Sequence, residues 1–323
     1  MNLFTDTDKK KVLLISLLLN LALLTGLFFA VRHNVQLRHS MPAEEPALVN
    51  VDTRALRDNA ADYGVSIEYL QLALPDYLVY VHKGEYVFEL LDDELPRHSY
   101  DWDKLVFEGE RAWYRDDDWP DACLGVDVSY FPKESDWEAV AADGVEFALV
   151  RLGYRGYSEG ALYEDELAAA NLDGAKAAGL KVGAYFFSQA ITVEEAEAEA
   201  ELALKILGGR KLDYPVAFDM EEIYGETART DELTREEATE IAQAFCRRIK
   251  KGGYQPMIYG NAAWLAARID RKALRDVPVW LAQYHYRVNY PYAFAIWQYT
   301  ASGRVQGIEG EVDLNICFDP EEL

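Results

Sequence analysis

The chain of 323 residues has few cysteines and histidines, and it lacks the signatures of several enzyme classes. Its three cysteines, Cys123, Cys246 and Cys317, are odd in number and far apart, which indicates neither a disulfide framework nor a metal site. We expect free, mostly buried thiols, with one bridge as the alternative. The five histidines form no cluster, and no H-E-x-x-H, G-x-S-x-G or phosphate-binding loop occurs. The sequence therefore predicts no metal and no cofactor.

Positive charge is also scarce. The chain carries 32 Lys and Arg against 56 Asp and Glu, a formal net charge of -24. A phosphate backbone would be repelled by this excess of negative charge, so nucleic acid is excluded as a partner. An uncharged substrate such as a neutral polysaccharide remains compatible with it.

One long apolar run is present near the N-terminus. Residues 12–31 contain no charge and are long enough to span a bilayer. The rival interpretation is a cleaved signal peptide, whose apolar region is shorter and ends at a small-residue site that this chain lacks. Three lysines precede the run and two arginines follow it. We therefore expect a single-pass membrane anchor at residues 12–31, a cytoplasmic tail at 1–11 and the remainder outside the cell.

Two segments separate this run from the rest of the chain. Residues 32–50 have two prolines and no periodicity, which predicts a stalk. Residues 51–119 contain two strand-turn-strand patterns, one around His82–Glu85 and one around Glu108–Glu110. They predict a small β-rich module, in which no motif indicates a function.

Residues 120–323 alternate between strand and helix patterns. Capping-box sequences at Thr192 and Thr234 predict two helix starts. The connections after Tyr284 and Thr300 are too short for full helices. The pattern predicts an α/β fold, an irregular (β/α) TIM-like barrel with helices missing in its last third. The expected strands are 124–129, 147–153, 181–187, 214–221, 256–261, 277–284, 294–300 and 312–318.

Acidic residues stand at the ends of these apolar strands. The stretch YPVAFDMEE, residues 214–222, places Asp219 and Glu221 two positions apart, and such residues face the same side of a strand. Asp127 closes GVDVS, and Asp313 lies beside the last strand. Any one of them taken alone fits a strand running out into a solvated loop. Because a TIM-like barrel gathers its working residues at one face, we expect all four to meet there.

Clustered carboxyl groups in a partly dry site suit glycosidic cleavage. Their pKa values move apart, so that one group stays protonated while another stays ionised. The protonated group can protonate the leaving oxygen, and a second group stabilises or captures the sugar cation. Sugar rings also stack on aromatic side chains. The residues that we expect to bind substrate near the strand ends are Arg151, Tyr185, Trp280, Gln283 and Trp297.

Residues 124–318 resemble a glycoside hydrolase family 25 lysozyme, a Chalaropsis-type N-acetylmuramidase. The resemblance rests on GVDVSYFPKESDW, GAKAAGLKVGAYFFS, YPVAFDMEE, PVWLAQY and WQYTASGRVQGIEGEVDLN. It implies an irregular β/α barrel that hydrolyses the β-1,4 bond after N-acetylmuramic acid in peptidoglycan.

The resemblance also implies a role for each acid. Glu221 matches the general acid and Asp219 its partner carboxylate, while Asp127 and Asp313 match the acids that complete the site. Asp219 would act as the nucleophile, or would orient the acetamido group of the substrate; the residues leave both open. Two other functions also stay open, a non-catalytic peptidoglycan-binding scaffold and a glycosidase acting on another N-acetylated polymer. No pattern indicates an oligomeric state.

Overall fold

The computed structural model describes residues 53–62, 64–116, 122–130, 135–223, 225–318 and 323. Residues 54–323 form one compact unit. The expected tail, membrane span and stalk at residues 1–50 lie outside the described residues. Among the helices that are described, none is both long enough and apolar enough to cross a membrane.

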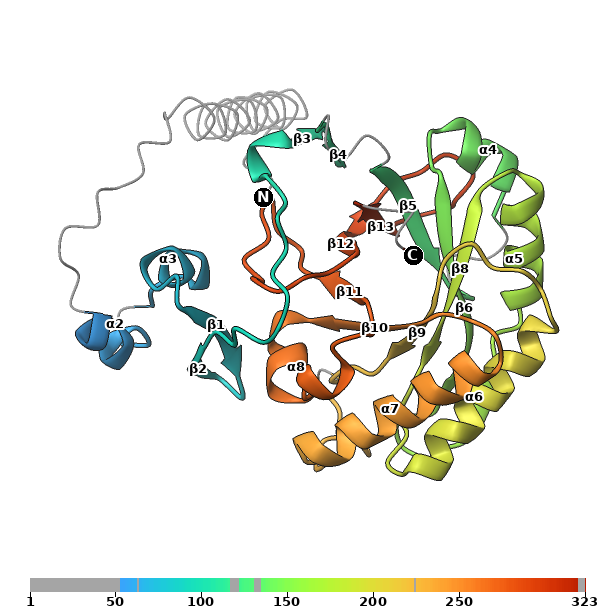
Figure 1. The fold of residues 1–323 in the computed structure, drawn as a ribbon. Helices are drawn as coiled ribbons and strands as arrows, with labels where there is room; N and C mark the ends of the chain where they lie inside the picture. The colour runs from blue at the N-terminus through green and yellow to red at the C-terminus, as the bar shows by residue number, and fades with distance from the viewer. Residues whose placement is uncertain (1–52, 63, 117–121, 131–134, 224, 319–322) are drawn as a thin grey trace, which may run out of the picture. The chain divides into compact units, whose positions relative to one another are not determined.

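Eight strands close into a barrel (Figure 1). Every strand expected between residues 124 and 318 is present, and the pairing of the first two completes the ring. The strands are β5 (Cys123–Val128), β6 (Phe147–Arg155), β8 (Lys181–Phe187), β9 (Val216–Asp219), β10 (Pro256–Asn261), β11 (Val279–Ala282), β12 (Ile296–Gly303) and β13 (Val312–Cys317).

The barrel is not parallel throughout. Strands β5, β6, β8, β9, β10, β11 and β12 pair in parallel, whereas β13 runs antiparallel to both of its neighbours, β12 and β5. A short strand, β7 (Leu162–Glu164), pairs antiparallel with the end of β6. The reversal of β13 brings the start of this strand to the edge at which the other strands end.

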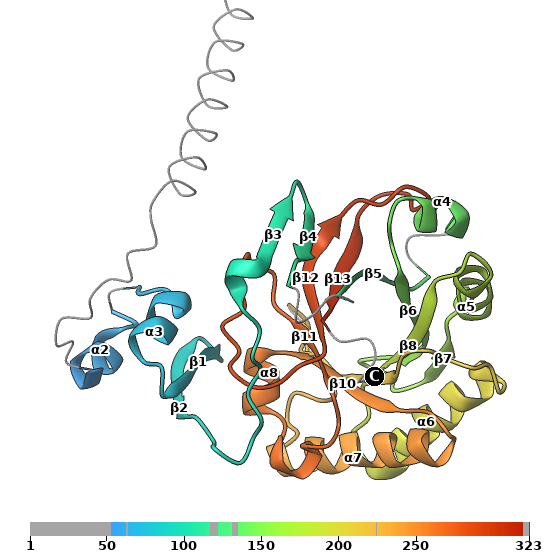
Figure 2. The same cartoon turned by 45° about the horizontal axis from the view of Figure 1, so that its top comes forward.

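Helices α5, α6 and α7 pack on the outside of the sheet (Figure 2). The predicted helix starts are confirmed, because the side chains of Thr192 and Thr234 accept hydrogen bonds from the N–H groups three residues ahead. Within residues 283–295 and 304–311, all of which are described, no helix occurs. The helices are α4 (Trp137–Ala142), α5 (Ala168–Ala177), α6 (Val193–Leu207), α7 (Arg235–Lys251), α8 (Ala262–Ala267) and the 3-10 turn η2 (Lys272–Leu274).

The inside of the barrel is filled by side chains. Phe147, Tyr214, Met257 and Trp280 are among the buried residues that form this inner cluster. Gly125 makes room for one of them, since a Cβ at this position would lie 2.2 Å from Cζ of Phe147. The barrel is therefore a packed core rather than a channel, and only its rim is available for chemistry.

Residues 53–116 contain both expected hairpins and two helices that were not expected. Strands β1 (Tyr77–His82) and β2 (Glu85–Leu90) meet at a two-residue turn in which Lys83 and Gly84 have φ values of 51° and 82°. Strands β3 (Leu105–Glu108) and β4 (Arg111–Tyr114) follow the 3-10 turn η1 (Trp102–Lys104). Before them lie α2 (Thr53–Asn59) and α3 (Ile67–Ala73), so this part is mixed rather than β-rich.

Candidate active site

Four acidic side chains gather at one end of the barrel. Asp127 is the last residue but one of β5, Asp219 ends β9, and Glu221 follows two residues later. Asp313 is the second residue of β13, and its Cα pairs with that of Asp127 across the two strands. The charges of these groups act on one another. The structure therefore brings together all four acids that the sequence singled out.

Asp219 and Glu221 form a coupled pair. The strand expected over residues 214–221 ends at Asp219, so that Glu221 lies in the segment that follows, yet the two side chains still share a hydrogen bond. Burial raises the pKa of Glu221 to about 7; the hydrogen bond with Asp219 opposes this rise, and the charge of Asp313 adds to it. Burial also raises the pKa of Asp219 well above its usual value, with a further contribution from Glu221. Two carboxyl groups can hydrogen-bond only through a proton, so this pair is arranged to hold one.

One oxygen of Asp219 has no partner of its own. The side chain is 4% exposed, and its Oδ1 accepts no hydrogen bond from the N–H and O–H groups of the described residues. A buried acceptor without a donor costs free energy, and native proteins keep few of them. This oxygen is therefore an unsatisfied acceptor buried within the acid cluster.

The main chain at Asp219 is held from the neighbouring strand. The N–H of Ser188 donates to the carbonyl oxygen of Asp219 at 2.6 Å, and the hydroxyl of Ser188 donates to Glu199 Oε2, also at 2.6 Å. Glu199 is fully buried and accepts from Arg155 Nε at 2.6 Å. Burial raises the pKa of Glu199 to about 7. A buried ion pair on the outer side of β8 thus fixes the loop that faces the acid pair.

Asp127 is held by two amide side chains. Gln298 Nε2 and Asn315 Nδ2 both donate to its Oδ2, at 2.9 and 2.8 Å. Burial raises the pKa of Asp127, as do the charges of Asp313 and Glu221, whereas the two amides oppose the shift. Asp127 is 7% exposed, so most of its interactions are with protein rather than solvent.

Three aromatic side chains orient these amides. The hydroxyls of Tyr259 and Tyr284 each donate to Gln298 Oε1 at 2.8 Å. The indole N–H of Trp280 donates to Asn315 Oδ1 at 2.8 Å. Because each amide oxygen is occupied by a donor, each amide N–H is directed at Asp127. The network fixes the position of that carboxyl group.

Asp313 completes the cluster and is more exposed than Asp127 and Asp219. Its side chain is partly exposed, and burial raises its pKa to about 6. In the part of the chain that the structure describes, no group of three or more His, Cys, Asp or Glu side chains is arranged to hold a metal ion. The arrangement is suited to proton transfer among carboxyl groups.

Two of the expected substrate-binding residues lie beside the acids. Tyr185 is 9% exposed; burial raises the pKa of its hydroxyl, and the charge of Asp127 raises it further. Arg151 pairs with Tyr185 across β6 and β8, and its Nε donates to Asp165 Oδ2 at 2.9 Å. The positive charge of Arg151 also acts on Asp219. Both residues therefore border the mouth.

Two cavities lie at this end of the barrel. One, of about 380 Å³, is lined by Arg151 and by the stacked rings of Tyr154 and Tyr163, whose centroids are 5.0 Å apart. The other, of about 570 Å³, is lined by Glu221 and Gln283 among other residues. Gln283 thus lies where the sequence placed it, in the same cavity as the expected general acid.

The two tryptophans differ from the expectation. Trp280 and Trp297 are 1% and 0% exposed, so neither ring offers a face to a substrate. Trp280 points into the barrel core, and Trp297 packs in the outer layer, with its N–H donating to the carbonyl oxygen of Gln283 at 2.8 Å. An exposed aromatic ring in the 570 Å³ cavity belongs instead to Tyr284, which is 57% exposed.

The amide side chains around Asp127 were not predicted as site residues. Gln298 and Asn315 are polar residues inside the apolar strands β12 and β13. Asn315 stands two residues after Asp313, which places both on one face of the strand. A search for polar residues at that spacing would have found Asn315. Gln298 carries a weaker signal, because it lies alone between two aromatic residues.

Comparisons with known proteins agree with this geometry. The sequence model described as "Glycosyl hydrolases family 25" matches residues 126–308. An autolytic lysozyme of Clostridium acetobutylicum is 27% identical over 192 residues, which cover 59% of this chain and 54% of that protein. The chain therefore spans about half the length of this curated relative.

Two solved structures share the fold. The modular autolysin LytC from Streptococcus pneumoniae, in complex with a synthetic peptidoglycan ligand, has a TM-score of 0.54 at 23% identity; the match covers 74% of this chain and 56% of that one. A family 25 glycosyl hydrolase from Bacillus anthracis has a TM-score of 0.53 at 20% identity and covers 67% of this chain and 97% of its own. At these identities, the similarity establishes the fold alone.

Proposed function

The chain belongs to glycosyl hydrolases family 25, and we propose that it is a muramidase that cleaves the β-1,4 bond between N-acetylmuramic acid and N-acetylglucosamine in peptidoglycan. The observation that carries the proposal is the hydrogen-bonded pair of Asp219 and Glu221 at the barrel mouth. The autolytic lysozyme and the autolysin bound to a peptidoglycan ligand support this choice of substrate.

Glu221 acts as the general acid. Its carboxyl group is partly exposed and lines an open cavity, and its pKa is raised to about 7. An acid of this strength is protonated in a useful fraction near neutral pH and can transfer its proton to the leaving oxygen. Burial of the acid cluster maintains this protonation.

Asp219 orients the acetamido group of the substrate. Asp219 lies beside the proposed general acid, where its carboxyl group would accept a hydrogen bond from the acetamido N–H. The acetamido oxygen would then attack the anomeric carbon while Glu221 protonates the leaving oxygen. In retaining enzymes with a carboxylate nucleophile, the two carboxyl groups are about 5–5.5 Å apart, on either side of the scissile bond. A pair in direct hydrogen-bond contact favours the acetamido-assisted route over a nucleophilic Asp219.

Asp127 and Asp313 shape the electrostatics of the mouth. Asp313, whose pKa is about 6, contributes negative charge near the reacting centre, where the transition state of glycosidic cleavage is cationic. Asp127 is fixed by its two amide donors, and Asp313 is partly exposed. The charge of Asp313 stabilises the developing sugar cation and helps keep Glu221 protonated.

The enzyme is held at the outer face of the cell membrane. The uncharged run at residues 12–31 is long enough to span a bilayer, and the lysines that precede it favour a cytoplasmic N-terminus. Peptidoglycan lies outside that membrane, so this orientation places residues 54–323 on the side of the substrate. Cell fractionation of the full chain and of a version lacking residues 12–31 tests this; recovery of both versions in the soluble fraction would contradict it.

The activity is tested on residues 54–323, which form one compact unit. This fragment and its Glu221→Gln variant are incubated with purified peptidoglycan, and the reducing-end sugar is identified by mass spectrometry. Reducing N-acetylmuramic acid from the wild type alone is the expected result. Reducing N-acetylglucosamine would overturn the bond assignment, and cleavage confined to another N-acetylated polymer would overturn the substrate. Absence of cleavage, with both proteins still bound to the wall, would favour a binding scaffold.

The role of Asp219 has its own test. A thiazoline analogue of N-acetylglucosamine mimics the cyclised acetamido group, and we expect it to inhibit the wild type. A 2-fluoro glycoside lacks the acetamido group and traps a covalent sugar on a carboxylate nucleophile. Mass spectrometry that detects such a sugar on the peptide containing Asp219 would overturn acetamido assistance.

A further inference from the structure

The cavity next to the proposed general acid is only partly built by the barrel. Of the residues around its volume of about 570 Å³, Glu221, Gln283 and Tyr284 belong to the barrel. The opposite side comes from α3 and β1, in a set of residues that we call the α3–β1 wall: Ile67, Glu68, Val79, Tyr80 and Val81. Segments more than 130 residues apart in sequence therefore enclose the same space.

A second cavity is also lined both by Glu221 and by the β1–β2 hairpin. It has a volume of about 320 Å³ and is lined by Glu221 together with Lys83, which lies in the turn between β1 and β2. The turn is well defined, because Lys83 and Gly84 both take the positive φ values that a tight hairpin requires. The hairpin thus lines two cavities that the proposed general acid also lines.

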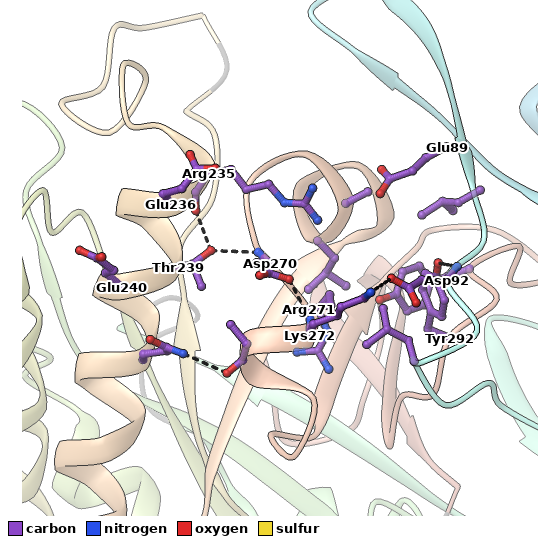
Figure 3. A pocket seen from close by; sticks show the side chains of 17 residues that line it. Glu89, Asp92, Arg235, Glu236, Thr239, Glu240, Asp270, Arg271, Lys272 and Tyr292 are labelled. Carbon is purple, nitrogen blue, oxygen red and sulfur yellow. Dashed lines mark hydrogen bonds and ion pairs between the residues drawn. The ribbon is translucent and has the colours of Figure 1, made fainter.

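The hairpin is fastened to the barrel by charged and polar contacts. Lys272 Nζ lies 2.8 Å from Asp92 Oδ2, just beyond the end of β2 (Figure 3). The same Nζ lies 2.7 Å from Glu94 Oε2. The N–H of Asp92 donates to the hydroxyl of Tyr292 at 2.9 Å. These contacts border a separate cavity of about 460 Å³ that none of the four acids lines.

The α3–β1 wall is also joined to the rim itself. His285 Nε2 lies 3.8 Å from Glu68 Oε1, which links the segment after β11 to the first turn of α3. Strand β1 packs beside α8, the helix that follows β10. The wall therefore lies against the rim on the β10–β11 side.

The lining of the cavity suits an uncharged sugar. Ile67 and Val81 contribute apolar surface, and Val81 is 37% exposed. The exposed ring of Tyr284 offers a stacking surface, while Asn261 and Gln283 carry amides that can hydrogen-bond hydroxyl and acetamido groups. Sugar rings combine an apolar face with polar edges, and cavities of this composition recognise ligands by both.

We propose that the α3–β1 wall is part of the glycan-binding cleft and forms a subsite for sugar units next to the scissile bond on the β10–β11 side of the barrel. The inference rests on the proposed function for the identity of the glycan, and it assigns a role to a part of the chain outside the residues that match the family. The wall makes long glycan strands better substrates than short ones, because only long strands reach it.

The test compares matched substitutions on α3 and on the β1–β2 hairpin. Ile67→Gln and Val81→Gln alter the wall, whereas Leu72→Gln and Leu90→Gln change leucines that are 66% and 65% exposed and line none of the cavities described above. With long glycan strands, we expect the wall variants to raise KM about 5- to 10-fold with little change in kcat, while the control variants leave KM unchanged. With the shortest cleavable oligosaccharide, all four should match the wild type.

Binding without turnover separates this inference from the proposed function. In the Glu221→Gln background, affinity for glycan strands is measured by calorimetry, and hydrogen exchange is followed in residues 77–82. Weaker binding by the wall variants, with protection of β1 by the strands, supports the subsite even if the wild type cleaves nothing. Equal binding by wall and control variants overturns the subsite even if the wild type is an active muramidase. Absence of binding by every form overturns it as well.

Discussion

Asp127 and Asp313 are direct Cα partners across the β5–β13 ladder, although 185 residues separate them in sequence. Their pairing depends on the antiparallel direction of β13, because only a reversed strand presents its second residue at the edge where β5 ends. The last strand thus supplies an acid from its start, whereas β5 and β9 supply theirs from their ends. Burial raises the pKa of Asp127, and the charges of Asp313 on the facing strand and of Glu221 raise it further.

The pH dependence of the reaction should follow Glu221. Its pKa of about 7 means that the acid loses its proton as the pH rises through neutrality. We expect kcat/KM to fall on the alkaline side with an apparent pKa near that value. Initial rates on soluble glycan strands between pH 4 and 9 measure this profile. A rate that stays constant up to pH 9 would contradict the role of Glu221 as the acid.

The same group should make the folded protein less stable at alkaline pH. The pKa of Glu221 in the folded state lies above its ordinary value. At pH values between the two, the folded state therefore binds more protons than the unfolded state. Its contribution to stability is fully present below about pH 4.5 and is lost as the pH rises through about 7. Glu221→Gln should therefore raise the free energy of unfolding at pH 8, on the order of 1 kcal/mol after allowing for solvent screening at the open mouth. Urea unfolding at pH 4.5 and pH 8 measures the difference.

The matched control for both experiments is Glu222→Gln. Glu222 is exposed and directly follows the acid pair. This change should leave both the alkaline limb of the rate profile and the free energy of unfolding at pH 8 close to those of the wild type. A gain in stability equal to that of Glu221→Gln would show that removal of any negative charge is sufficient.

The amide network around Asp127 should matter for stability and for rate. Asn315→Leu removes one donor to Asp127 and leaves the N–H of Trp280 without its acceptor. We expect a loss of about 1–3 kcal/mol in the free energy of unfolding, because buried polar groups lose their partners, together with a lower kcat. Thr300→Val is the control, since the hydroxyl of Thr300 bonds only at the exposed end of β12. Equal unfolding midpoints for the two variants would contradict the role of the network.

The buried pair of Arg155 and Glu199 should be costly to break. Arg155→Met leaves Glu199 buried with only Ser188 as its side-chain partner, and removal of one member of a buried ion pair costs about 3–5 kcal/mol. Because the pKa of Glu199 is already about 7, the loss should be larger at pH 8 than at pH 5.5, where the carboxyl group is protonated. Denaturant unfolding at both pH values tests this. Arg115→Met breaks an exposed pair with Glu108 and should change stability by less than about 1 kcal/mol. A pH-independent loss in Arg155→Met would argue against a charged Glu199.

Several features follow from short stretches of sequence, because interactions between neighbouring residues specify them. The eight strands are continuous apolar runs, and Thr192 and Thr234 start helices by capping the first turn. The pair Lys83 and Gly84 marks a hairpin turn in the same way. The helices α2 and α3 were missed, since seven residues form too few turns for a clear helical period.

The tertiary structure decided what the local pattern leaves open. The sequence by itself determined which acids end the strands, and the resemblance of its motifs pointed to the family. The direction of β13, the burial of Trp280 and Trp297, and the amides that hold Asp127 depend on contacts such as Gln298 to Asp127, which are 171 residues apart. The position of α3 and β1 beside Glu221 likewise depends on contacts between residues far apart in sequence. Periodicity and capping are properties of neighbouring residues, whereas the side of a barrel on which a ring or a hairpin packs is set by residues far away in the chain.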